Sequence, residues 1–165
     1  MDIVSHVLIG GALAVPVANS AQEVGIITLF SVLPDLFQIP LYLRIGSLYH
    51  RSFWISHSYD WKGFRKAHPL WSELWEIPHS LLFLVFIVVP LVMIFDLPLM
   101  AMAVYFLHIF VDGFTHRGEW ALKPLYPFSY KERGFTNAWA WGGRRMVISW
   151  IVLGVTIVFL KLFFS

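Results

Sequence analysis

Long apolar stretches constrain the fold of this chain more than any other feature. Four are evident at once, and a fifth, in which Pro98 suits a helix start, follows the third after only Asp96. Apolar segments of this kind form membrane helices, which need about 20 residues to cross a bilayer. We therefore predict an all-α polytopic membrane bundle of about five transmembrane helices, in a single membrane-embedded domain (1–165), with helices at about 3–18, 24–43, 79–95, 97–113 and 146–164.

The composition supports a membrane protein and excludes several other classes. Hydrophobic residues make up 58% of the chain and charged residues 13%, whereas a soluble domain carries about 25% charged residues. So little polar material excludes an ordinary soluble domain, a disordered chain and a nucleic-acid-binding module. The absence of cysteine excludes disulfides, thiolate metal sites and cysteine nucleophiles. The net charge of +2 is too small to indicate a polyanionic partner such as nucleic acid. Membrane lipid is the expected partner, because the helices are predicted to lie in a bilayer.

The basic residues are distributed unevenly between the connecting segments. If all five helices cross, residues 44–78 and 114–145 lie on the same side as interfacial loops. These two loops hold 11 of the 12 basic residues, and the remaining one, Lys161, lies on the other side. Basic loops stay cytoplasmic. We therefore expect the N-terminus and both large loops in the cytoplasm, and the loops' many tryptophans along the membrane surface.

Two ionisable residues lie four apart inside the fourth apolar stretch. His108 and Asp112 share one helix face, with about 6 Å between their Cβ atoms. An aspartate in a membrane helix costs about 2.5–3.5 kcal/mol on insertion scales, so something must compensate. On their own, the two residues are explained equally well by a hydrogen-bonded pair that joins two helices and by a metal site.

The other helices favour the metal site. His6 lies near the start of the first helix, Asp35 in the later part of the second, and His79 at the start of the third. With alternating helix directions, these residues reach the same cytoplasmic depth as His108 and Asp112. Neutral imidazole and carboxylate are a ligand set for zinc, manganese or iron, and a divalent cation offsets buried carboxylates. We therefore predict a divalent metal, most simply zinc, bound by His6, Asp35, His79, His108 and Asp112 at the cytoplasmic end of the bundle.

Two further residues are candidates for catalytic roles. His116 continues the face of His108 and Asp112 by one turn, and Glu76 is close to His79 in sequence. The histidines of the first loop are expected at the membrane surface, although one of them could complete a metal site: His50, His57 and His68. Four arginines fit either phosphate binding or topology determination: Arg117, Arg133, Arg144 and Arg145.

Five short motifs occur in order along most of the chain: Met1-Asp2-Ile3-Val4-Ser5-His6, Leu33-Pro34-Asp35, His79-Ser80-Leu81, His108-Ile109-Phe110-Val111-Asp112 with Thr115-His116, and Pro124-Leu125-Tyr126-Pro127-Phe128-Ser129. They resemble the bacterial and archaeal family described as membrane-bound, predicted metal-dependent hydrolases, whose best-known branch is LexA-regulated. The resemblance implies a metal-dependent hydrolase in a prokaryotic cytoplasmic (inner) membrane.

The order of the predicted ligands is more distantly similar to that of zinc-dependent phospholipase C and P1-type nucleases. That similarity implies a phosphoester substrate, such as a small molecule or a lipid-linked compound. The leading hypothesis is therefore a membrane-embedded metal-dependent hydrolase. The alternative is a non-catalytic metal-binding membrane protein or transporter, because intramembrane Asp and His also mark ion pathways. A bis-histidine haem protein ranks last, since haem needs no aspartates at the same depth.

Overall fold

The computed structural model describes residues 3–49, 61–135 and 143–164, and their secondary structure is helical apart from one antiparallel bridge between Leu122 and Arg133. The all-α prediction is confirmed. The helices, in order, are α1 (Ile3–Ala14), α2 (Ala21–Leu36), α3 (Ile39–Tyr49), α4 (Trp61–Ala67), α5 (Pro69–Glu76), α6 (Leu81–Phe83), the π-helix η2 (Leu84–Val88), α7 (Val89–Ile94), α8 (Met100–Thr115), the 3₁₀ turn η3 (Gly118–Trp120) and α9 (Gly143–Phe164).

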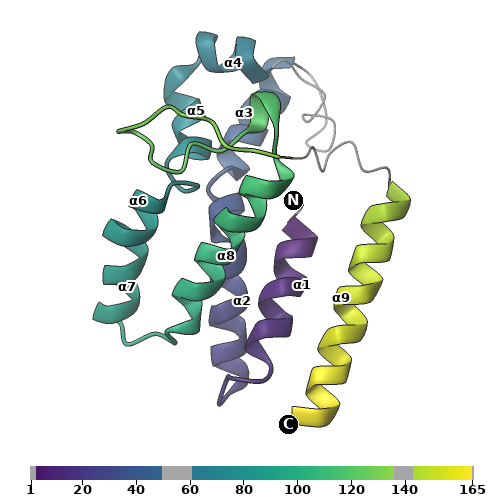
Figure 1. Cartoon of the computed structure of the whole chain (residues 1–165). Coiled ribbons are helices and arrows are strands. Elements are labelled where there is room, and N and C mark those ends of the chain that lie inside the picture. The colour runs from purple at the N-terminus through teal and green to yellow at the C-terminus, as the bar shows by residue number, and fades with distance from the viewer. Residues whose placement is uncertain (1–2, 50–60, 136–142, 165) are drawn as a thin grey trace.

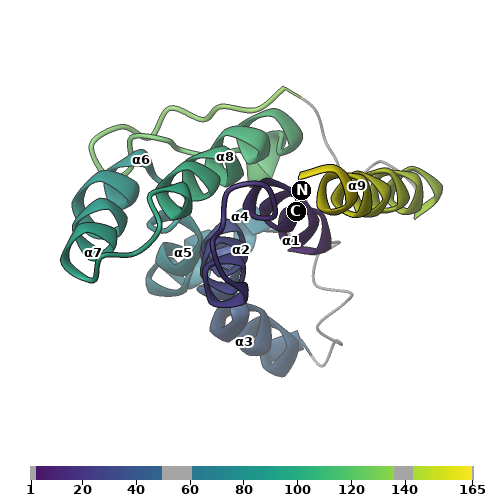
Figure 2. The ribbon, with the colours of Figure 1, turned by 90° about the horizontal axis from the view of Figure 1, so that it is seen from below.

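The helices run roughly parallel and antiparallel to one another, and α2 packs against both α1 and α8. Helix α9 lies on the outer side of α1 (Figure 2). The short connectors lie at the lower end of the view in Figure 1, whereas α4, α5 and the segment after α8 lie at the upper end. The two large connecting segments therefore share one end of the bundle, as the alternation of helix directions predicted.

Proline and serine residues set several helix boundaries. Ser20 caps α2 by accepting a hydrogen bond from the amide of Glu23, and Ser80 caps α6 in the same way from Phe83. The helix predicted at 24–43 is divided into α2 and α3 close to Pro40, which has no N–H to donate to the Leu36 carbonyl. Pro90 likewise has no N–H to donate. Next to it, the amide of Val89 bonds to the Leu84 carbonyl five residues back, which is the π-helical pattern of η2.

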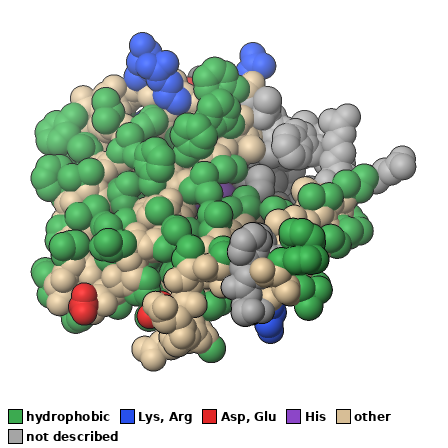
Figure 3. Space-filling model, turned by 60° about the horizontal axis from the view of Figure 1, so that its bottom comes forward, with side chains coloured by type: hydrophobic (Ala, Val, Ile, Leu, Met, Phe, Trp, Pro, Cys, Tyr) green, Lys and Arg blue, Asp and Glu red, His purple; other side chains and the backbone are tan. Residues whose placement is uncertain are grey.

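Helix length supports fewer crossings than the five predicted. Ala21–Ile45, which combines α2 with part of α3, is long and apolar enough to cross a membrane, and the bent pair Pro69–Glu76 and Leu81–Ile94 is a second candidate. Helices α1 and α8 are apolar but have only 12 and 16 residues, against the roughly 20 that a full span needs. The number of crossings therefore stays a prediction. Hydrophobic side chains nevertheless cover most of the face drawn in Figure 3.

The segment predicted as the first interfacial loop, 44–78, is largely helical where the structure describes it. It contains the end of α3, then α4 and α5. Pro69 starts α5 because proline fits the first turn, where no N–H is needed. In the second predicted loop, 114–145, the described residues between η3 and position 135 are mostly irregular, and the paired backbones of Leu122 and Arg133 fold this part back on itself.

Candidate metal centre

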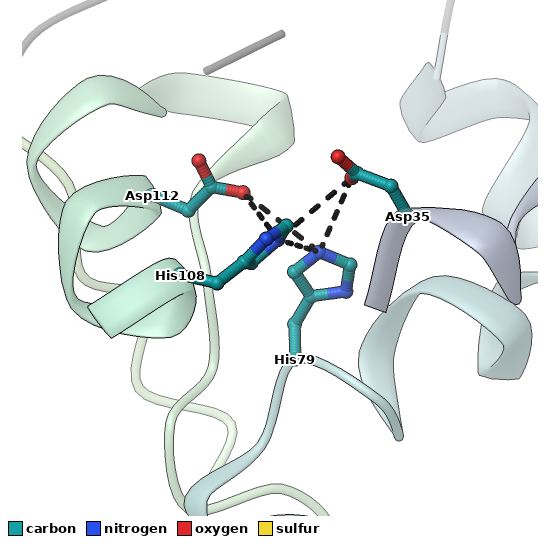
Figure 4. A group of neighbouring side chains, drawn as sticks. All are labelled: Asp35, His79, His108 and Asp112. Atoms are coloured by element: carbon teal, nitrogen blue, oxygen red, sulfur yellow. Dashed lines mark hydrogen bonds and ion pairs between the residues drawn. The ribbon is translucent and has the colours of Figure 1, made fainter. Parts of the chain in front are cut away.

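Four ionisable side chains from three parts of the chain meet at the upper end of the bundle. Asp35 comes from the last turn of α2, His79 from the turn before α6, and His108 and Asp112 from α8. One ligand atom from each lies within 4.8 Å of the others. Figure 4 shows the two carboxylates on either side of the two imidazoles. The structure thus brings together four of the five residues that we predicted as metal ligands, in a group that can hold a metal ion.

The distances within this group suit one small cation. The Nε2 atoms of His79 and His108 are 3.3 Å apart, and Asp112 Oδ2 is 3.3 Å from His108 Nε2 and 3.8 Å from His79 Nε2. Asp35 Oδ1 is 3.8 Å from both nitrogens. Tetrahedral zinc with ligands at about 2.0–2.1 Å separates neighbouring ligand atoms by about 3.3–3.4 Å. The group is therefore at, or slightly wider than, the size of a tetrahedral site.

Backbone carbonyls hold both imidazoles in the orientation that a metal requires. The Nδ1 atom of His79 lies 2.8 Å from the Trp75 carbonyl, and that of His108 lies 2.7 Å from the Ser31 carbonyl. A carbonyl only accepts, so each Nδ1 carries the proton and donates it, which leaves the lone pair on Nε2. Two Nε2 lone pairs facing each other at 3.3 Å repel unless a proton or a metal cation lies between them. This orientation by a second hydrogen bond is typical of metal-bound histidine.

A break in a helix places His79. Helices α5 and α6 are parts of a pair bent by 64°, and His79 lies in the break. The backbone there is stabilised from elsewhere: the Tyr105 hydroxyl donates to the Pro78 carbonyl at 2.6 Å, and the Leu81 amide donates to the Pro124 carbonyl at 2.8 Å. The ring of Trp75, 2% exposed, stacks on His79 with 4.4 Å between ring centroids. His79 is therefore fixed from two sides.

His6 and His116 lie on the other oxygen of Asp112. His6 Nε2 is 3.0 Å from Asp112 Oδ1, and His116 Nδ1 is 3.4 Å from the same oxygen. The His6 ring also stacks on His108, with centroids 3.7 Å apart. His6, predicted as a ligand, is therefore outside the group of four and positions Asp112 by a hydrogen bond. His116, predicted as catalytic, is buried directly beside the group.

Comparison with known proteins agrees with the membrane character of the chain. Residues 1–165 match the family model described as YdjM inner membrane protein. The chain belongs to this family. No curated protein and no solved structure matches the chain. The membrane prediction is thus confirmed at the level of the family, and YdjM membership alone specifies neither a reaction nor the LexA-regulated branch.

Two residues beside the group in this YdjM protein were missed by the sequence analysis. Gln38 Nε2 donates to Asp35 Oδ1 at 3.0 Å, and the Tyr42 hydroxyl donates to Gln38 Oε1 at 2.8 Å. The signal was present, since Asp35, Gln38 and Tyr42 follow one another at helical spacings of three and four. It was not used because the site argument considered only ionisable side chains. The Asp35 side chain is 16% exposed, whereas those of the other three residues are at most 1% exposed, so the group opens toward Asp35.

Glu76, our second catalytic candidate, is engaged in ion pairs. Its Oε1 lies 2.9 Å from Lys123 Nζ and 3.2 Å from Arg65 Nη1. One turn earlier, Glu73 accepts a hydrogen bond from the Tyr126 hydroxyl at 2.6 Å. Burial and that hydrogen bond raise the pKa of Tyr126, so its phenol keeps the proton that it donates. These contacts fasten α5 to the segment after η3, which gives Glu76 a structural reason to be buried.

The remaining candidates do not join the group in the part of the chain that is described. The ring of His68 packs near Phe64, with centroids 4.9 Å apart. His50 and His57 lie outside the described residues. Arg117 and Arg133 are exposed, and the side chains of Arg144 and Arg145 are outside the described part.

Proposed function

We propose that this YdjM-family protein is a membrane-embedded metal-dependent hydrolase. Asp35, His79, His108 and Asp112 would hold one divalent metal, and zinc suits two imidazoles with two carboxylates best, with manganese and iron as the other metals that accept this set. The observation that carries the proposal is the pair of Nε2 atoms, 3.3 Å apart and both turned inward by backbone carbonyls.

The residues fit a metal in a second respect. Asp35 Oδ2 is buried and has no hydrogen-bond partner among the described residues. A buried polar atom without a partner costs about 1–3 kcal/mol, and more if it is charged, and a cation held by this carboxylate would offset part of that cost. When bound, a divalent metal supplies a Lewis acid and lowers the pKa of a coordinated water toward neutrality.

The protein residues around the group would bind and orient the substrate. Asp35 is the least buried of the four donors, so a substrate would approach from its side, beside Gln38 and Tyr42. We propose a phosphoester, water soluble or lipid linked, whose hydrolysis adds water across a P–O bond and protonates the leaving oxygen. The charge of the second large segment suits an anion, with six basic and two acidic residues in 113–145. His116, held against Asp112, is the residue proposed to handle the proton.

The proposed site would face the cytoplasm. The donor residues lie at the end of α2, just before α6 and toward the end of α8. This is the end of the bundle that carries both large segments (Figure 1), and those segments contain most of the basic residues. By the distribution of basic residues, that end is cytoplasmic. Substrate would thus come from the cytosol or from the inner leaflet of the inner membrane.

Metal content tests the centre itself. Elemental analysis of protein purified in detergent should find about one zinc, manganese or iron per chain, because the four donors form one group. Asp112→Asn, His108→Ala and Asp35→Asn should each lose most of it while staying in the membrane. Asp96→Asn is a matched control, because Asp96 lies between α7 and α8 at the far end with a φ of 49°, which asparagine tolerates. Full occupancy in the three site variants would refute the metal centre.

Activity tests the reaction. Zinc- or manganese-loaded protein should hydrolyse a generic phosphodiester or a phospholipid headgroup, and Asp35→Asn should abolish this activity. The alternative, a metal transporter, draws on the depth of the group, since His79, His108 and Asp112 are almost fully buried. Loaded protein that is inert toward phosphodiesters, phosphomonoesters and phospholipids, yet moves metal across liposomes, would replace the hydrolase with the transporter.

A further inference from the structure

A second feature lies on the opposite face of α8 from the metal centre. It is an open groove of about 270 Å³ between α8, the start of α6 and the segment after η3. Apolar side chains line almost all of it, chiefly Leu81, Phe106, Ile109, Phe110 and Phe114, and Arg133 is the one charged residue among the described residues of the lining. None of the four donor residues lines the groove, so it is a separate site.

The aromatic rings of the groove form a ladder that runs along α8. Phe106, Phe110 and Phe114 follow at intervals of four, with ring centroids 6.1 Å and then 4.8 Å apart. Phe135 stacks on Phe114 at 5.1 Å. The three rings of α8 are 45–50% exposed. The ladder therefore rises from the middle of the apolar bundle to the end at which Arg133 lies, and presents an apolar surface to the membrane.

The backbone of Arg133 is held in place, and its charge has no carboxylate partner among the described residues. Its amide and carbonyl both bond to Leu122, at 2.8 and 3.1 Å. Its neighbour Glu132 is 4.0 Å from Arg65 instead. Among the described residues, no carboxylate lies within 4.0 Å of the Arg133 guanidinium. Gly134, next to it, packs so closely on the His116 carbonyl that a side chain would not fit, which fixes the end of the groove.

We propose that this groove binds a phospholipid molecule of the surrounding membrane, with one acyl chain along the phenylalanine ladder and the phosphate on Arg133. The volume of the groove agrees with this occupant. It is smaller than the roughly 300–1,000 Å³ of a typical small-molecule pocket, so it holds only part of one acyl chain. The charge agrees too, because the planar guanidinium fork pairs with phosphate oxygens. An apolar ladder that ends in a single cation at one end of the bundle matches the tail and headgroup of one lipid.

Lipid retention by the full chain tests this site. The protein is reconstituted in bilayers of phosphatidylethanolamine and phosphatidylglycerol and extracted in mild detergent, and retained lipid is counted by native mass spectrometry. Wild type should keep one phospholipid per chain. Arg133→Gln should reduce retention about tenfold, the effect of losing a charge-assisted hydrogen bond. Lys131→Gln, an exposed cation two residues away that does not line the groove, should retain lipid like wild type.

A second variant fills the groove without touching Arg133. A Cβ on Gly113 would have no heavy atom within 4 Å, and Gly113 lines the groove, so Gly113→Leu occupies the space of the chain and should also lose the lipid. Bilayers that also contain diacylglycerol separate tail from headgroup: wild type should prefer phospholipid, and Arg133→Gln should lose this preference. Unchanged metal content in these variants shows that the metal centre is intact and keeps this test independent of it.

Three results would overturn lipid binding in the groove, and a fourth would overturn the position of the phosphate. The three are a wild type that retains no stoichiometric phospholipid, equal retention by Arg133→Gln and Lys131→Gln, and a dimer whose formation Gly113→Leu abolishes. The last result would mean that a second copy of the chain covers the groove. Equal retention of diacylglycerol and phospholipid by wild type would overturn the assignment of the phosphate to Arg133.

Discussion

Replacing Gly10 with alanine tests whether the contact between α1 and α2 supports the metal centre. A Cβ at Gly10 would lie 2.1 Å from Ser31 Oγ and 2.5 Å from Ser31 Cβ. Ordinary contacts begin near 3.4 Å, so the two helices must separate by about 1 Å. Ser31 also donates through its hydroxyl to the His6 carbonyl at 2.9 Å, and its own carbonyl accepts from His108. One methyl group therefore disturbs packing and ligand orientation together.

The expected loss of stability follows from three contributions. Overpacking costs about 1–3 kcal/mol. Weakening the hydrogen bond from Ser31 to His6 costs about 1 kcal/mol. Alanine in place of glycine returns up to about 1 kcal/mol through helix propensity. Gly10→Ala should therefore lower the free energy of unfolding by about 1–3 kcal/mol, and metal affinity should fall about tenfold or more because His108 loses its fixed carbonyl partner.

Gly25→Ala is the matched control for this prediction. Gly25 lies in α2, and a Cβ there would meet nothing within 4 Å, so the same substitution should leave metal affinity unchanged and should not lower stability. Thermal unfolding in detergent and metal titration of both variants measure the two effects. If Gly10→Ala matches Gly25→Ala in both measurements, the close approach of α1 and α2 at Ser31 does not support the centre.

Three further predictions concern other parts of the structure. Trp75→Ala should lower stability by about 3–5 kcal/mol, since it empties a large buried volume, and should weaken metal binding by releasing the imidazole on which it stacks; unchanged metal affinity would contradict the positioning role. Glu76→Gln should cost about 3–5 kcal/mol by leaving two cations without their buried partner, whereas Glu132→Gln, at a side chain 52% exposed, should change stability by less than about 1 kcal/mol; both are read from unfolding midpoints, and equal effects would refute the buried pair. Cysteines at Ser47 and Ser129, in a chain that has none, should resist an impermeant thiol reagent outside intact cells, and labelling without lysis would reverse the orientation.

The donor group could be predicted because each part of it has a local sequence signal. His108 and Asp112 are four apart in a stretch where ionisable groups are costly. Alternating helix directions then bring the end of one helix and the start of the next to the same depth, which placed Asp35 and His79 beside them. These arguments need only the period of the helix and the order of the segments.

The finer arrangement could not be predicted, because it depends on side-chain rotation and on backbone breaks. Sequence spacing puts His6 at the right depth but does not say which oxygen of Asp112 it contacts. The helical continuation through Gln38 depends on how the chain passes Pro40. The carbonyls of Ser31 and Trp75, which orient the two imidazoles, carry no sequence signal, since every residue has one. Glu76 was assigned from its proximity to His79 in sequence, whereas its partners, Lys123 and Arg65, are distant in sequence or on another helix.

The order in which the donor residues are synthesised has a consequence for when the donor group is complete. Segments emerge from the N-terminus onward, so Asp35 and His79 are delivered well before α8. Until α8 arrives, Asp35 and His79 have their partners from the earlier segments, such as Gln38 and the Trp75 carbonyl, but lack their contacts with His108 and Asp112. Helix α8 brings His108 and Asp112 together, and Asp112 in turn engages His6 in α1. The donor group is therefore complete only when α8 has joined the earlier helices, which makes α8 the last element that metal binding would require.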